Sequence, residues 1–144
     1  MHIVQYILIY IIFGFIGYLF ELCVSDKKNI KHKLKGDTII KKILKWNIPF
    51  INIYGIGVVL LLLINKYINI QNIYVLSIIS GLILTYLECL SGYISLVINK
   101  RHTWNYKNQL LPCCDNYISL DVGLFWMLCS FVFHFIIRKI NISV

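Results

Sequence analysis

Charged residues are scarce in this chain, and acidic ones are the scarcest. Of its 144 residues 14% are charged, with six Asp or Glu against fourteen Lys or Arg, whereas 59% are hydrophobic. That balance is far from the one found in soluble globular domains. A soluble domain of this size would expose large apolar patches, because its interior is too small to hide them. The shortage of charge therefore excludes an ordinary soluble domain and indicates the lipid bilayer as the solvent.

Signatures of several enzyme and nucleic-acid-binding classes are absent from the sequence as well. There is no G-x-x-x-x-G-K-[ST] loop, so the chain does not hydrolyse ATP through that machinery by itself. No G-x-S-x-G or H-E-x-x-H motif occurs, and there is no zinc-finger or RNA-recognition signature. We expect no enzymatic activity, no cofactor and no nucleic-acid partner.

The cysteines and one histidine offer little support for a metal site. Five cysteines are an odd number, so no disulfide framework is implied. Cys113 and Cys114 are adjacent and lack a second pair, which makes them poor ligands for one tetrahedral ion. His134 has no cysteine or carboxylate at metal spacing, and a packed or hydrogen-bonded histidine is the favoured interpretation. We expect no metal, and these residues receive no functional role.

Four apolar stretches predict an all-α, polytopic integral membrane protein, a bundle of about four transmembrane helices in one domain over residues 1–144. The stretches are residues 3–24, 48–64, 73–99 and 118–137, and a helix rises about 1.5 Å per residue toward a hydrocarbon core of about 30 Å. The first lacks the charged start and cleavage site of a secretory signal, so we expect a retained helix. Pro49 suits the first turn of the second helix, the shortest of the four.

Basic residues in the connections predict the orientation of the chain. Eleven Lys or Arg lie in the connections 25–47 and 100–117, against three in the remaining connection and the two ends. The positive-inside rule therefore places these two loops in the cytoplasm and both termini on the opposite side. The lysine-rich loop is residues 25–47, and its tract from Lys27 to Lys45 is suited to binding anionic lipid.

Acidic residues within the apolar stretches are the candidates for a functional site, because a carboxylate in hydrocarbon costs roughly 2.5 kcal/mol or more. Glu21 and Glu88 each lie on a stripe of small residues at helical spacing, and Asp121 begins the fourth stretch. Small residues allow another helix to approach closely. The predicted packing positions are Gly14, Gly17, Gly81, Thr85 and Gly92.

We expect Glu21 and Glu88 to share one interhelical site in the cytoplasmic half of the membrane, with Asp121 converging on it, and to bind a cation, a proton or a cationic substrate. Each acid also has a structural interpretation. Glu21 would reach the lipid headgroups, Glu88 would form an interhelical hydrogen bond, and Asp121 would complement the helix dipole.

Five short motifs follow one another in an order typical of one family. Gly17 to Glu21 is similar to G-W-x-x-E and Ile53 to Gly57 to I-Y-G-x-G, while Leu87 to Gly92 is similar to L-E-Y-L-[ST]-G. Further on, Trp104 to Tyr106 is similar to W-D-Y and Leu124 to Trp126 to S-L-x-W. On these residues the chain resembles the bacterial CmpB-type, permease-like membrane proteins described as ABC-transporter type IV.

This resemblance implies a transport permease. The partners we consider are a second copy of the chain or a separate ATPase subunit. The resemblance also singles out the interfacial motif residues Tyr54, Gly55, Trp104, Tyr106 and Trp126. Departures fall in the loops: Asn105 stands for the aspartate of W-D-Y, and Asn116 and Tyr117 stand for a glycine and an arginine. The first loop is a lysine tract where the family carries glycines and a proline.

Two functions are consistent with these residues. The first is a transporter-like or permease-like component in which Glu21 and Glu88 line an internal polar site. The alternative is a membrane scaffold whose glutamates fix helix packing and whose basic loop binds anionic lipid or a partner protein.

The predicted orientation can be tested by labelling. Lys35 lies in the lysine-rich loop, which the excess of basic residues places in the cytoplasm. A cysteine introduced by Lys35→Cys should therefore not react with an impermeant thiol reagent added outside intact cells. Efficient labelling would reverse the topology.

Overall fold

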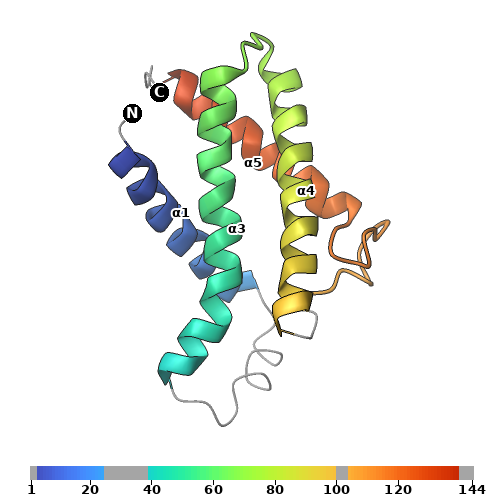
Figure 1. The fold of residues 1–144 in the computed structure, drawn as a ribbon. Coiled ribbons are helices and arrows are strands. Elements are labelled where there is room, and N and C mark those ends of the chain that lie inside the picture. Colours follow the sequence, from blue (N-terminus) through green and yellow to red (C-terminus); the bar gives the residue numbers. More distant parts are fainter. Residues whose placement is uncertain (1–2, 25–38, 100–103, 140–144) are drawn as a thin grey trace. The chain divides into compact units, whose positions relative to one another are not determined.

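The computed structural model describes residues 3–24, 39–99 and 104–139, and their side chains except at 18, 20–24, 39–52, 95, 98 and 99. Its helices are α1 (Ile3–Val24), α3 (Ile39–Tyr67), α4 (Ile73–Asn99) and α5 (Leu120–Lys139), and no strand occurs within the described ranges (Figure 1). The all-α prediction is therefore confirmed. The chain divides into two compact units, residues 1–59 and 60–144.

Helix bounds agree with the apolar stretches to within about three residues, except at the start of α3. α1 and α4 have the predicted ranges, and α5 is shifted by two residues. α3 instead begins at Ile39, so the predicted start at Ile48 is wrong and Pro49 lies inside the helix. Isoleucine and leucine recur at 39, 40, 43 and 44 among lysines. This is an amphipathic helical pattern that a search for unbroken apolar stretches misses.

Two of the described helices are long and apolar enough to cross a membrane. They are α4, over Ile73–Ile94, and α5, over Leu120–Lys139. The apolar parts of the other two, Ile3–Gly17 and Ile53–Tyr67, are shorter. The structure thus supports membrane spans by α4 and α5, while crossing by α1 and α3 stays a prediction.

In the first unit, glycines and tyrosines pair between α1 and α3. The ring of Tyr54 occupies the space where a side chain at Gly17 would lie. In return Tyr10 packs at Gly55, where an added Cβ would lie 2.7 Å from the Tyr10 carbonyl oxygen. Gly17 leaves room for the Tyr54 ring, and Gly55 leaves room for Tyr10. The motif that contains Gly17 and the motif that contains Tyr54 therefore contact each other here.

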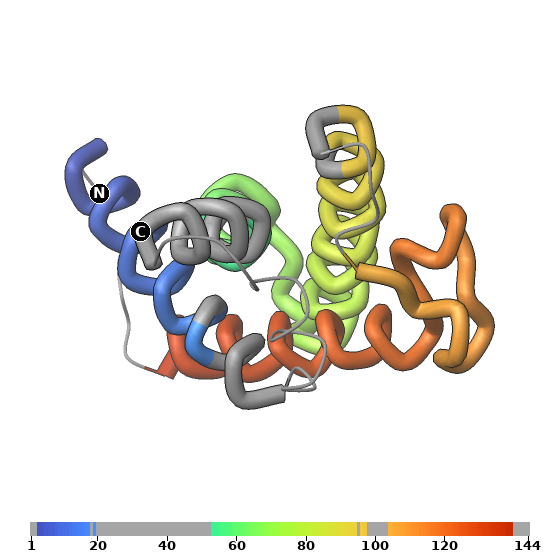
Figure 2. The backbone as a smooth tube through the Cα atoms, turned by 90° about the horizontal axis from the view of Figure 1, so that it is seen from below, coloured from blue at the N-terminus to red at the C-terminus, as the bar shows by residue number. Residues whose placement is uncertain are grey.

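In the second unit, α4 and α5 pack directly on each other and cross, as the view in Figure 2 shows. At the contact an added Cβ on Gly81 would lie 2.6 Å from the Cα of Met127, so the α5 backbone occupies that space. Thr85 contacts Gly123 one turn further along, with more room. Small residues at this contact let the two backbones approach closely.

Polar contacts fix the other end of the second unit. The Asn72 side chain accepts hydrogen bonds from the backbone N–H groups of Tyr74 (2.9 Å) and Val75 (3.3 Å), which caps the start of α4. Arg138, near the end of α5, donates to the carbonyl oxygens of Gln71 and Ile70, both at 2.6 Å. The end of α5 is thereby tied to the connection between α3 and α4.

The polarity of α4 and α5 is the reverse of that in a soluble protein. Their buried residues include the polar side chains of Ser77, Ser80, Glu88, Ser130 and His134. Their exposed faces carry large apolar residues: Val75, Ile78, Leu82, Leu124, Leu128 and Val132. Polar groups turned inward and apolar groups turned outward are the arrangement that a hydrocarbon solvent favours.

The close approach of α4 and α5 predicts opposite outcomes for two glycine-to-alanine changes. Gly81→Ala forces a methyl group against the α5 backbone and should lower stability by about 1–3 kcal/mol. Gly123→Ala is the control, since its Cβ would lie 3.6 Å from the Thr85 hydroxyl and alanine favours helix. Thermal unfolding of the two purified variants in detergent measures the difference. Equal stability would contradict the proposed contact.

Candidate functional site

Glu88 is buried on α4, with 6% of its surface exposed, and it receives hydrogen bonds at both carboxyl oxygens. The Tyr106 hydroxyl donates to Oε1 at 2.7 Å, and the Trp126 indole N–H donates to Oε2 at 2.5 Å. Tyr106 comes from the connection before α5 and Trp126 from α5 itself. Three of the family-like motifs therefore meet at one carboxyl group.

The segment 104–119 holds Tyr106 in place through its own backbone. The Tyr106 N–H donates to the Asn116 carbonyl at 2.7 Å, and the N–H of Cys113 donates to the carbonyl of Ile118 at 2.9 Å. Another bond joins the N–H of Leu120 to the carbonyl of Leu110 at 2.9 Å. This segment is thus a closed, hydrogen-bonded loop, and its conformation positions the donor on Glu88.

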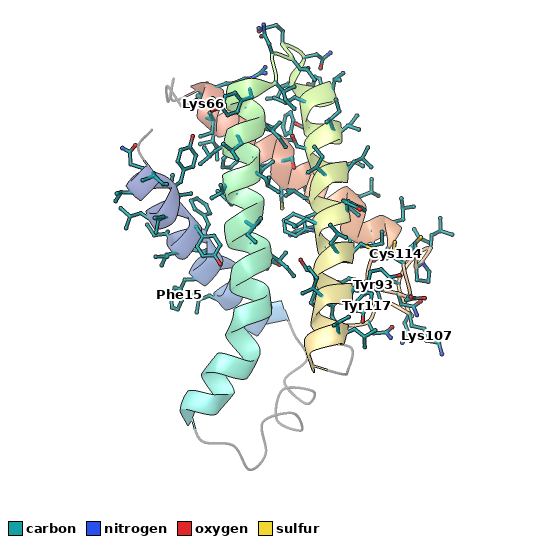
Figure 3. All side chains as sticks on the ribbon, viewed as in Figure 1. Phe15, Lys66, Tyr93, Lys107, Cys114 and Tyr117 are labelled. Atoms are coloured by element: carbon teal, nitrogen blue, oxygen red, sulfur yellow. The ribbon has the colours of Figure 1, made fainter. Side chains whose placement is uncertain are left out.

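Tyr117 anchors this loop against α4. Its side chain is fully buried and fills the space beside Gly92. Trp104 donates its indole N–H to the Tyr117 carbonyl at 3.1 Å, and the rings of Trp104 and Tyr93 stand edge-on to that of Tyr117. Figure 3 shows Tyr93 and Tyr117 together beside the lower part of α4. Burial raises the pKa of Tyr117, so it stays a neutral aromatic anchor.

The loop geometry accommodates two of the three departures from the motifs that this loop resembles, Asn105 and Asn116. Asn116 stands where the family has glycine, and its φ of 65° lies in the left-handed region, which asparagine tolerates better than most other side chains. Asn105 stands for aspartate, and its Oδ1 accepts a hydrogen bond from the Lys107 N–H at 2.8 Å. An aspartate oxygen would form the same turn. Both substitutions therefore keep the local fold.

The convergence of the other two acids, Glu21 and Asp121, on this site stays a prediction. Asp121 lies in the first turn of α5, and the two bonds on Glu88 come from aromatic donors instead of from it. Its Oδ1 is buried without a hydrogen-bond partner in the described part of the chain. Glu21 belongs to α1, but its side chain lies outside the described residues, as do the lysines from 27 to 35 and the side chains of those from 41 to 45. A shared site of Glu21 and Glu88 remains a prediction.

The adjacent cysteines do not gather a set of metal ligands. No group of three His, Cys, Asp or Glu side chains suited to a metal ion occurs among the described residues. Cys113 is exposed and Cys114 is half-buried. A hydrogen bond with Cys89 raises the pKa of Cys114 to about 12, so Cys114 is a thiol near neutral pH.

A second buried polar contact joins α4 and α5 next to Gly81. The Ser80 hydroxyl and His134 Nε2 lie 2.9 Å apart, and both residues are fully buried. The other ring nitrogen, Nδ1, and the hydroxyl of Ser130 one turn earlier have no partner within the described ranges. The histidine is therefore packed and hydrogen-bonded inside the helix pair, as the sequence favoured.

Inward polar groups, outward apolar faces and two helices long and apolar enough to span a membrane are together typical of a helical membrane protein. A family model described as "Putative ABC-transporter type IV" matches residues 8–143. The chain belongs to this family, and the resemblance seen in its motifs is confirmed. No curated protein and no solved structure matches the chain.

The left-handed conformation of Asn116 predicts how its substitution acts. Asn116→Gly should be tolerated, because glycine adopts this conformation freely. Asn116→Val should lower stability by roughly 1–2 kcal/mol, because a β-branched residue is strained there. Asn108→Val, at an exposed position of the same loop, serves as the control. Equal unfolding temperatures for the two valine variants would contradict the assigned conformation.

Proposed function

We propose that this protein is a membrane transport component in which the Glu88 carboxyl is the ion-binding group, for a proton or a monovalent cation. The observation that carries the proposal is a buried carboxyl group, in a helix long enough to span a membrane, contacted by donors from two other segments. Ionisable groups at such positions are expensive to bury and are retained mainly where ions or substrates pass. Membership of the family described as ABC-transporter type IV is consistent with a transporter-like role.

The hydrogen bonds also suit a change of charge at Glu88. The Tyr106 O–H and the Trp126 N–H both donate to the Glu88 carboxyl group, and hydrogen bonds of this kind stabilise its ionised form. A bound proton or cation would then neutralise a group that is already held in a fixed geometry. Binding would therefore require little rearrangement of α4 or α5.

The scaffold remains the alternative, and the same bonds favour it in one respect. Tyr106 and Trp126 connect the loop and α5 to α4 through Glu88, so the carboxyl group also holds the unit together. The two functions differ in whether the negative charge itself is needed. A scaffold requires the hydrogen bonds, whereas an ion-binding group requires the charge.

Orientation and partners complete the proposal. With the loops 25–47 and 100–117 in the cytoplasm, the Tyr106 side of Glu88 faces the cytoplasmic surface. The lysine tract from Lys27 to Lys45 would lie along anionic headgroups at that surface. Since the chain lacks an ATP-binding loop, any ATP-driven movement would need a separate ATPase subunit.

Replacing Glu88 by Gln separates the two functions. The glutamine oxygen can accept from Trp126 while its amide donates to the Tyr106 oxygen, so both contacts survive and only the charge is lost. In phosphatidylcholine and phosphatidylglycerol vesicles we expect Glu88→Gln to reduce proton, Na⁺ or K⁺ flux at least about tenfold, while the protein stays folded.

Two further variants complete this experiment. Asp115→Asn removes an exposed loop carboxylate, which accepts from Tyr93, and should leave the flux unchanged. Glu88→Leu removes the acceptor of both hydrogen bonds and should reduce the amount of folded protein. Unchanged flux in Glu88→Gln, or no flux of any of the three ions in the wild type, would rule out the proposed ion-binding role and leave the scaffold.

A further inference from the structure

The two donors on Glu88 differ in what they can do when the carboxyl group gains a proton. The Trp126 indole nitrogen carries one N–H and can only donate. The Tyr106 hydroxyl can donate through its hydrogen or accept through its oxygen. The two carboxyl oxygens are therefore not equivalent.

This difference determines where a proton can be held. Oε2 must remain an acceptor in both protonation states, because the Trp126 N–H points at it at 2.5 Å. A hydrogen on Oε2 would face that N–H directly. A hydrogen on Oε1 can instead donate to the Tyr106 oxygen, once the Tyr106 hydroxyl has turned its own hydrogen away. Protonated Glu88 thus keeps two hydrogen bonds only when the proton is on Oε1.

The hydrogen bonds to the two carboxyl oxygens of Glu88 also differ in how deeply they are buried. Trp126 is buried, with 7% of its surface exposed, and its bond to Glu88 is buried. Tyr106 is half-buried in the loop 104–119, and its bond to Glu88 is only partly buried. The oxygen that can hold a proton is therefore the one on the more accessible side.

We infer that Glu88 binds a proton on Oε1 and that the Tyr106 hydroxyl relays it to and from water at the 104–119 loop. The inference rests on the proposed function in treating Glu88 as the ion-binding group, and it names the proton as the ion. In uptake, Tyr106 gives its hydroxyl proton to Oε1 and accepts a proton on its own oxygen from hydronium in the adjoining water, which leaves a neutral water molecule. One proton is gained, Tyr106 is restored, and the Trp126 bond is unchanged. Release is the reverse.

Other titratable groups on the neighbouring elements could give a similar signal. They are Cys89 and Tyr93 on α4, Cys114, Asp115 and Tyr117 in the loop, and Asp121 on α5. Only carboxyl groups produce the C=O stretch of a protonated acid in the infrared. The assignment to Glu88 is therefore made by loss of that band in Glu88→Gln and its persistence in Glu21→Gln, Asp115→Asn and Asp121→Asn.

The test is the rate at which this acid band exchanges hydrogen for deuterium in phosphatidylcholine and phosphatidylglycerol vesicles. We expect Tyr106→Phe to slow exchange on the order of a hundredfold, the effect of a positioned proton-transfer group. Tyr86→Phe removes the hydroxyl of an exposed tyrosine on α4, outside the site, and should leave the rate within about twofold. Equal slowing in both variants, or no slowing in Tyr106→Phe, would overturn the relay.

A measurement on the wild type covers variants that fail to fold. In protein with ring-deuterated tyrosine, the C–O stretch of one tyrosine should shift at the same pH as the acid band, because Tyr106 changes from donor to acceptor. If no tyrosine C–O stretch shifts at the pH at which the acid band titrates, the relay is overturned. Ion flux that depends on Glu88, without an acid band that titrates, would refute the relay and leave the proposed function standing. An acid band whose exchange depends on Tyr106, without ion flux, would refute the proposed function and leave the relay standing.

Discussion

A buried carboxyl group in a low-dielectric interior must be hydrogen-bonded, and much of the second unit is arranged around that requirement at Glu88. α5 supplies Trp126, and it can do so because Gly81 lets the two helices touch. The loop supplies Tyr106, and it can do so because Asn116 turns the chain and Tyr117 anchors it beside Gly92. The helix contact and the loop conformation therefore both serve to place hydrogen-bond donors on Glu88.

Much of the helical architecture could be predicted from the sequence, because a membrane span leaves a long apolar stretch that needs no partner to be recognised. The bounds of α1 and α4 agree with their apolar stretches to the residue. The start of α3 was not predicted, since Lys41, Lys42 and Lys45 interrupt the apolar pattern while leaving one helical face intact. The mean hydropathy of a segment indicates which solvent surrounds it, whereas the spacing of its apolar residues indicates whether it forms a helix.

The candidate site shows where sequence reasoning reaches its limit. Glu88 was identified from the cost of burying a carboxylate, and Tyr106 and Trp126 from the family-like motifs, but nothing in the sequence linked the three. That link depends on a loop with left-handed residues at Leu111 and Cys114, positions where sequence favours no such conformation. The available signal was the pair Asp115 and Asn116, since aspartate and asparagine tolerate a left-handed backbone better than most other residues.

The contact between Arg138 and the carbonyls of Ile70 and Gln71 has a consequence for how the molecule is made. A ribosome completes α4 and the whole 104–119 loop before it adds Arg138, so during synthesis two carbonyl oxygens of the α3–α4 connection lack their final donor. The contact can form only after the last turn of α5 has left the ribosome. This link between the two ends of the second unit is therefore among the last of its contacts to form during synthesis.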